Sequence, residues 1–173
     1  ERGGTESVEA YNVDLLARQN YGAGGESDPR RMEAAIRICH RVTELDPNYA
    51  KAWALMALGQ MIVHFIHGKK GDDGLAAAER ALALNPNLAE AHAVKARIFA
   101  ETGRNEEASA EIANGLRLDP ESFEVNRSAG LLSFREQRLE DAIRYWEKAT
   151  ALVETDVASP SMLTTCYTAL GDN

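Results

Sequence analysis

The sequence predicts an all-α protein, a solenoid of antiparallel helix pairs, and three observations support this. Alanine is abundant, aromatic residues make up only 6%, and Val, Ile and Thr form no alternating runs, so propensity favours helix over strand. A Leu-Asx-Pro segment recurs at residues 45–48, 84–87 and 118–121, where it is expected to close one helix and open the next. Pro86 and Pro120 lie 34 residues apart, a period typical of helical repeats.

The first helix pair is expected in residues 8–47. Its two helices are predicted at residues 8–21 and 31–44, and the Gly-rich stretch 22–29 between them predicts an expanded turn. Insertions in surface turns cost little chain entropy, so this one does not disturb the repeat. Residues 1–7 are expected to form a flexible N-terminal segment.

The second helix pair is expected in residues 48–86, which hold five residues more than the 34-residue period. The surplus falls at residues 64–74 and predicts a lengthened first helix followed by a Gly-rich turn. Residues 61–66 are apolar all round the helix, more than one buried face requires. We expect the long turn of the preceding unit to cover them. The alternative is a homodimer contact or partner docking patch, made by Ile62, Phe65 and Ile66.

Two further units are expected in residues 87–120 and 121–154, and a partial one in 155–173. In the third unit Ala96 and Phe99 lie on the first helix, Gly103 breaks it, and Ala108 lies on the second. The partial unit has the spacing of a first helix only. The chain begins with Glu1 instead of Met, so we expect an excerpt of a longer protein whose array continues.

The period and these small residues resemble the tetratricopeptide repeat family, from about Tyr11 to Gly171. The resemblance implies a tetratricopeptide-type α-solenoid: a right-handed superhelix with a single array of about four and a half repeats over residues 8–173. It also implies a protein-interaction scaffold. Lys95 stands where the family usually has Leu, and Asn126 where it often has Trp. These departures predict weakened first helices in the third and fourth units.

A narrower resemblance concerns the phrases at residues 10–16, 45–53 and 82–92. They look like the repeat arrays that follow the effector domain in bacterial adenylate cyclases and winged-helix transcriptional activators. This implies an alternative function, a regulatory or oligomerising segment of a larger effector.

A partner is expected in the concave groove, which the first helices of stacked pairs line. The groove combines apolar side chains with two arginines, which suits an extended peptide or amphipathic helix whose carboxylate Arg97 or Arg127 could bind. The alternative is that these side chains only face solvent or are covered by neighbouring repeats. Helical spacing assigns to the groove the residues Lys51, Ala54, Leu58, Met61, Glu90, Ala93, Arg97, Glu124, Arg127, Leu131 and Phe134.

Composition argues against other classes of partner. A net charge of −8 provides no basic stripe for nucleic acid, and no apolar run reaches the roughly 20 residues of a membrane span. The two cysteines lie far apart and form neither a CxxC pair nor a disulfide framework. We therefore expect a cytoplasmic protein that binds another protein or peptide.

No catalytic motif occurs in the sequence, so no enzyme activity is expected. The stretch 22–25 is Gly-rich, but no strand precedes it and no Lys-Ser/Thr follows, so a mobile turn is expected instead of a phosphate site. His64 and His67 have weak metal-ligand spacing, but two ligands are too few. We expect no metal and no cofactor.

Overall fold

The computed structural model describes residues 5–21, 27–153 and 158–171. In this part of the chain there are nine α-helices and no strand. The helices are α1 Val8–Tyr21, α2 Pro29–Leu45, α3 Ala50–Met61, α4 Leu75–Leu84, α5 Ala89–Glu101, α6 Asn105–Leu118, α7 Phe123–Arg135, α8 Leu139–Leu152 and α9 Ala158–Gly171. A π-helical turn, η2 Ile62–Ile66, continues α3.

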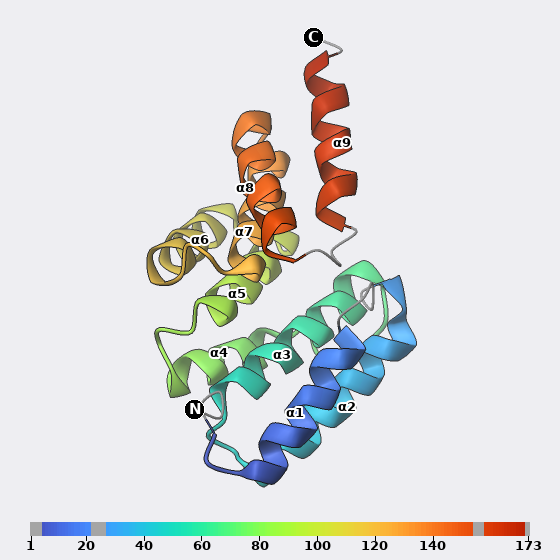
Figure 1. Cartoon of the computed structure of the whole chain (residues 1–173), viewed down its shortest axis with the longest axis vertical. Helices are drawn as coiled ribbons and strands as arrows, with labels where there is room; N and C mark the ends of the chain where they lie inside the picture. The colour runs from blue at the N-terminus through green and yellow to red at the C-terminus, as the bar shows by residue number, and fades with distance from the viewer. Residues whose placement is uncertain (1–4, 22–26, 154–157, 172–173) are drawn as a thin grey trace.

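Consecutive helices pack as pairs, α1 with α2, α3 with α4, α5 with α6, and α7 with α8, while α9 packs against α8. The first helices of neighbouring pairs also touch, so α3 contacts α1 and α5, and α5 contacts α7. The pairs stack into an elongated array with α1 and α9 at opposite ends (Figure 1). The predicted α-solenoid is confirmed.

The helix bounds follow local signals in the chain. The prediction of residues 8–21 agrees with α1, and the prediction of 31–44 falls inside α2. Helix α2 begins earlier because the Asp28 side chain accepts a hydrogen bond from the Arg30 N–H, and because Pro29 fits the first helical turn.

Each Leu-Asx-Pro segment forms the same turn. The side chain of the Asx residue accepts a hydrogen bond from the backbone N–H two residues further on, an arrangement known as an Asx turn. The three bonds, each 3.0 Å, run from the N–H groups of Asn48, Asn87 and Glu121 to Asp46, Asn85 and Asp119.

A second bond closes these turns. The fourth residue of the next first helix lies within hydrogen-bond distance of the carbonyl of the turn's proline. Trp53 Nε1 donates to Pro47 at 3.0 Å, His92 Nε2 lies 2.9 Å from the Pro86 oxygen, and Asn126 Nδ2 donates to Pro120 at 2.9 Å. Three different side chains thus make the same contact, and Asn126 replaces the expected Trp without loss of the bond.

Lys95, the other departure from the family pattern, is also integrated into the packing. Its Nζ lies 3.2 Å from Oε1 of Glu111 on α6 and 5.3 Å from the ring centroid of Phe99. The aliphatic stem of a lysine can cover apolar surface while its ammonium reaches a carboxylate. The expected weakness at this position is therefore offset by an ion pair between α5 and α6.

The second unit contains the predicted long first helix and Gly-rich turn. Helix α3 runs into η2, and residues 67–74 then lead to α4. Gly74 has a left-handed φ of 90°, and a Cβ there would lie 2.4 Å from the Ala57 carbonyl oxygen. His64 Nδ1 lies 3.1 Å from the Gly71 carbonyl oxygen and ties the turn to η2. The π-helical geometry was not predicted.

The proposed patch of Ile62, Phe65 and Ile66 needs correction. Ile62 is fully buried in a core cluster, and Phe65 is half-buried against the same cluster. Only Ile66, 52% exposed, is open to solvent. Helix α2 packs against η2 and accounts for part of this burial. The turn expected to cover it, residues 22–26, lies outside the described residues.

Part of the segment expected to be flexible is held in place. Residues 1–4 lie outside the described part of the chain, but Thr5 is buried and its hydroxyl donates to the Asp46 carboxylate. Ser7 Oγ accepts a hydrogen bond from the Ala10 N–H at 3.1 Å and caps α1. The array therefore includes residues 5–7.

Candidate functional site

The first helices of the four pairs carry residues at equivalent positions on one side of the array. Helices α1, α3, α5 and α7 begin at residues 8, 50, 89 and 123, so positions two, five and nine of each helix can be compared directly. We call these positions the inner surface. The second residues are Glu9, Lys51, Glu90 and Glu124, the fifth are Asn12, Ala54, Ala93 and Arg127, and the ninth are Leu16, Leu58, Arg97 and Leu131.

Accessibility differs between the rows of the inner surface. Glu9 is exposed and Lys51, Glu90 and Glu124 are partly exposed, with one carboxylate oxygen of Glu124 buried. The fifth and ninth residues are accessible only on α1, where Asn12 and Leu16 lie, and on α7, where Arg127 and Leu131 lie. A partner could therefore contact charged groups along the array and larger side chains at both ends.

Five of the eleven predicted groove residues are buried, which corrects that part of the sequence interpretation. Leu58 and Met61 belong to a core cluster that α2, α4 and α5 complete. Ala54 packs in another cluster, and Ala93 packs against Val125 of α7. Arg97 is 6% exposed. Close packing of neighbouring first helices buries residues that helical spacing alone had assigned to the groove.

The α7 end keeps its predicted residues accessible. Arg127, Leu131 and Phe134 are all partly exposed. Leu131 and Phe134 pack against the cluster around Trp146, and the Phe134 and Trp146 ring centroids are 5.8 Å apart. The α7 end thus combines a guanidinium with two supported apolar side chains, which is the chemistry expected of a peptide-binding surface.

The α1 end was missed by sequence reasoning. Glu9, Asn12 and Leu16 are exposed, Leu16 by 52%, and they occupy the places of predicted groove residues on the other first helices. The equivalence was not predicted because the Leu-Asx-Pro period begins at Pro47, after α1, and the expanded turn at residues 22–29 changes the spacing within the first unit. The available signal was Ala10, a buried third residue like Ala52 of α3.

Helix α1 carries a buried carboxylate that sequence reasoning did not identify. Asp14 is 1% exposed, and its Oδ2 accepts hydrogen bonds from Arg18 Nε at 2.8 Å and Tyr49 Oη at 3.0 Å. Burial acts to lower the pKa of Arg18, but the carboxylates of Asp14 and Glu90 raise it.

Cys39 borders this carboxylate from α2. Burial, followed by the nearby charge of Asp14, raises the pKa of the Cys39 thiol to about 12. A thiol in this state is not a nucleophile near neutral pH. The cluster of Asp14, Arg18, Tyr49 and Cys39 joins α1, α2 and the start of α3.

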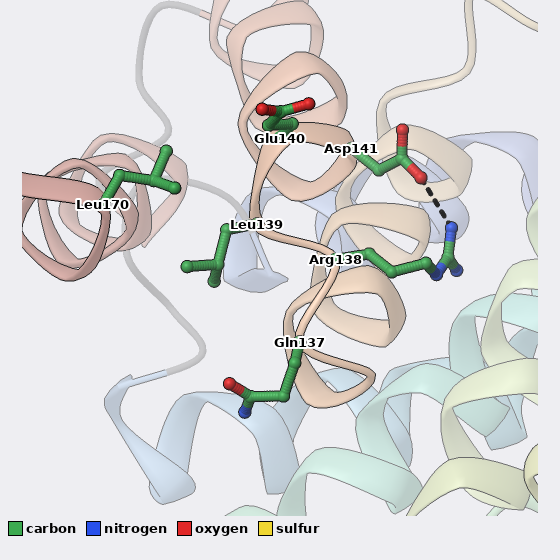
Figure 2. A pocket seen from close by; sticks show the side chains of 6 residues that line it. All are labelled: Gln137, Arg138, Leu139, Glu140, Asp141 and Leu170. Carbon is green, nitrogen blue, oxygen red and sulfur yellow. Dashed lines mark hydrogen bonds and ion pairs between the residues drawn. The ribbon is translucent and has the colours of Figure 1, made fainter. Parts of the chain in front are cut away.

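A cleft of about 480 Å³ lies between the start of α8 and the end of α9 (Figure 2). Leu139 and Leu170 face this space from the two helices. Arg138 forms ion pairs with Asp141 at 2.7 Å and with Glu136 at 2.5 Å. Gln137 and Glu140 are the other polar residues that line the cleft.

The histidines, the Gly-rich stretch and the apolar helices bear on the metal, phosphate and membrane hypotheses. His64 contacts the Gly71 carbonyl, as described above, and the described residues contain no group of three or more His, Cys, Asp and Glu side chains placed to hold a metal ion. The Gly-rich stretch 22–25 lies outside the described residues. No helix in the described part of the chain has the length and apolar character needed to cross a membrane.

Comparisons with known proteins agree with this architecture. Residues 67–129 match the tetratricopeptide repeat family. The fold is similar to the crystal structure of TTC0263, a thermophilic tetratricopeptide repeat protein of Thermus thermophilus, with a TM-score of 0.68, 16% identity, and coverage of 91% of this chain and 81% of that one. A structure of MamA is similar with a TM-score of 0.54, 15% identity, and coverage of 86% and 84%.

No curated protein matches the sequence. Residues 67–129 therefore match a tetratricopeptide repeat, and 91% of the chain shares the fold of a tetratricopeptide repeat protein.

Proposed function

We propose that this chain is a protein-interaction scaffold whose inner surface binds an extended peptide or a helix of a partner protein. The observation that carries the proposal is the at least partly exposed charged row Glu9, Lys51, Glu90 and Glu124, which leads to larger side chains that are exposed at the α1 end and partly exposed at the α7 end. Repeated helices hold this row at regular intervals, which suits a partner that is itself a regular polypeptide.

The two ends of the inner surface have different chemistry. On α1 the partner meets Leu16 and Asn12, an apolar and an amide side chain. On α7 it meets Arg127 beside Leu131 and Phe134, where a carboxylate of the partner would form a charge-assisted hydrogen bond. We therefore propose a partner segment with an apolar residue at one end and an acidic residue or terminal carboxylate at the other.

The test uses 12-residue peptides selected from a displayed random library against the protein. Their affinity is measured by fluorescence anisotropy for the wild type and for Lys51→Glu combined with Glu90→Lys, a variant that conserves net charge. We expect a loss of about tenfold in affinity, because two charge contacts become repulsive. The matched control is Glu106→Lys combined with Arg117→Glu, which exchanges two exposed charges on α6.

Unchanged affinity in the inner-surface variant, or an equal loss in the α6 control, would refute binding at the inner surface. Arg127→Ala refines the site further. Its affinity should fall for peptides with an acidic terminal residue and stay constant for their amide counterparts, because only the former offer a carboxylate to the guanidinium.

A further inference from the structure

Helix α2 differs in charge from every other second helix of the array. It carries four arginines against two glutamates, whereas α4 is balanced and α6 and α8 are net acidic. The whole chain has a net charge of −8, so this cationic helix is a local reversal of the prevailing sign. A local reversal of this kind marks a surface that attracts acidic groups.

Three of the four arginines of α2 lie on one side of the helix. Arg30, Arg37 and Arg41 are spaced by seven and four residues and are all exposed, and the buried residues Met32 and Cys39 lie on the opposite side. We call Arg30, Arg37 and Arg41 the arginine stripe. At 1.5 Å per residue the stripe is about 16 Å long.

The stripe carries more positive charge than its neighbours neutralise. Among the described residues, Arg30 and Arg37 have no carboxylate within ion-pair distance, and Arg41 contacts only the exposed Glu44, at 3.2 Å. Exposed pairs of this kind are weak and exchange partners readily.

The turn after η2 adds cations to the same face. Lys69 Nζ lies 2.5 Å from Glu33 Oε1, and Lys70 next to it is exposed. The hydrogen bond from Lys69 lowers the pKa of Glu33, and the charges of Arg37 and Arg30 lower it further. One carboxylate thus lies among three cations, and Ile66, exposed by 52%, is the last residue of η2, just before the turn that carries the two lysines.

We propose that the arginine stripe, with Lys69, Lys70 and Ile66, is a second docking surface and binds a short acidic segment of a partner protein. Carboxylates spaced one or two helical turns apart would reach the three guanidinium groups, which favour planar acidic partners. A nucleic acid fits less well. Its uniform charge would extend beyond the roughly 16 Å of the stripe onto the acidic surface of the rest of the array, where it would be repelled.

The test titrates a fluorescein-labelled 12-residue peptide of alternating Glu and Ala into the intact chain at 50 mM NaCl. We expect binding that weakens at 300 mM salt, and a loss of about tenfold in affinity for Arg30→Glu combined with Arg37→Glu. Arg80→Glu combined with Arg117→Glu is the matched control, because it reverses two exposed arginines on α4 and α6. This control should change the affinity by less than twofold.

The proposal is wrong if the peptide does not bind at 50 mM salt, or if both double variants weaken binding equally, which would indicate diffuse attraction. It is also wrong if a 12-nucleotide single-stranded DNA, or phosphatidylserine vesicles, bind the same arginines more tightly than the peptide. Arg30→Gln combined with Arg37→Gln provides a milder variant if charge reversal impairs folding. The inner-surface variant Lys51→Glu with Glu90→Lys should leave this affinity unchanged, which separates this proposal from the proposed function.

Discussion

The first two helix pairs, α1 to α4, and the next two, α5 to α8, have the same repeat but differ in turn length and in how their helices pack. In the first half the turns are long, η2 extends α3, and ionisable groups are buried around Asp14. In the second half the turns are short and the pairs pack through small residues: a Cβ on Gly130 would lie 2.6 Å from Trp146 Nε1. The Leu-Asx-Pro turns between helix pairs, here called junctions, have the same hydrogen bonds in both halves. The repeat therefore depends on the geometry of these junctions more than on the length of the turns within pairs.

Two tryptophans allow the halves to be observed separately. Trp53 lies in the first half and Trp146 in the second, so Trp146→Phe and Trp53→Phe backgrounds report on one half each. Repeat arrays unfold nearly as a sum of local and neighbour terms, and the two signals can therefore diverge. The predictions below use this property.

Among single substitutions, the largest effect is expected for Gly74→Ala. The substitution combines a left-handed φ of 90° with a Cβ placed 2.4 Å from the Ala57 carbonyl oxygen, so it should lower the free energy of unfolding by about 3 kcal/mol. Gly103→Ala is the matched control: φ is 76° but the Cβ would meet open space, and the cost should be about 1 kcal/mol. Urea unfolding followed by Trp53 measures Gly74→Ala, and urea unfolding followed by Trp146 measures Gly103→Ala; equal losses would contradict the packing role of Gly74.

Alkaline pH should destabilise the first half more than the second, although burial also raises the pKa of the Cys166 thiol, which packs beside Trp146. The pKa of Cys39 is raised from 9.0 to about 12, so between these values the unfolded thiol loses its proton while the folded one keeps it. The contribution of the protonated Cys39 thiol to the free energy of unfolding is therefore fully present below pH 9. Above pH 9 it falls by up to about 1.4 kcal/mol per pH unit. Burial also raises the pKa of Tyr49, which acts in the same direction.

Urea midpoints reported by Trp53 should thus fall between pH 9 and 12 faster than those reported by Trp146. Cys39→Ala should make the Trp53 dependence shallower. Identical pH profiles for the two tryptophans would show that the buried cluster does not distinguish the halves.

The hydrogen bond from Asn126 to the Pro120 carbonyl should stabilise the junction in the second half. Asn126→Ala removes the donors to the Pro120 and Ser122 carbonyls from a side chain that is 1% exposed, and should cost about 1–3 kcal/mol. Asn126→Asp is the sharper variant, because it keeps the size but replaces the donating amide with an acceptor. Thermal unfolding should rank wild type above both variants, and wild-type stability of Asn126→Asp would exclude a role for the bond.

The smallest effect is expected for Lys69→Met. The ion pair with Glu33 joins the long turn to α2, but both side chains are more than a third exposed, at 41% and 36%. Removing it should change the unfolding free energy by less than about 1 kcal/mol. A larger loss, measured by urea unfolding at 150 mM salt, would show that the long turn depends on this pair to stay in place.

The sequence predicted those parts of the fold that depend on local signals. The helices at residues 8–21 and 31–44 and the long turn at 64–74 follow from Pro, Gly and capping residues, whose effects extend only a few positions. The turn at η2 could not be predicted in detail, because π-helical geometry has no comparable local signal.

The candidate site was predictable only in part. Helical spacing identified Lys51, Glu90 and Arg127 as accessible, but it could not show that Leu58 and Ala93 are buried, because their burial depends on how closely neighbouring first helices pack. The α1 end was hidden by an insertion that interrupts the period. The arginine stripe was present in the sequence, but its contrast with other second helices becomes clear only when the helices are compared in space.

Hydrogen–deuterium exchange with a selected peptide bound tests the central claim most directly. We expect added protection in α1 and α7 and at the starts of α3 and α5, where the inner surface is accessible, and little change in α4, α6 and α8. Protection confined to the second helices, or absent at saturating peptide, would contradict the account.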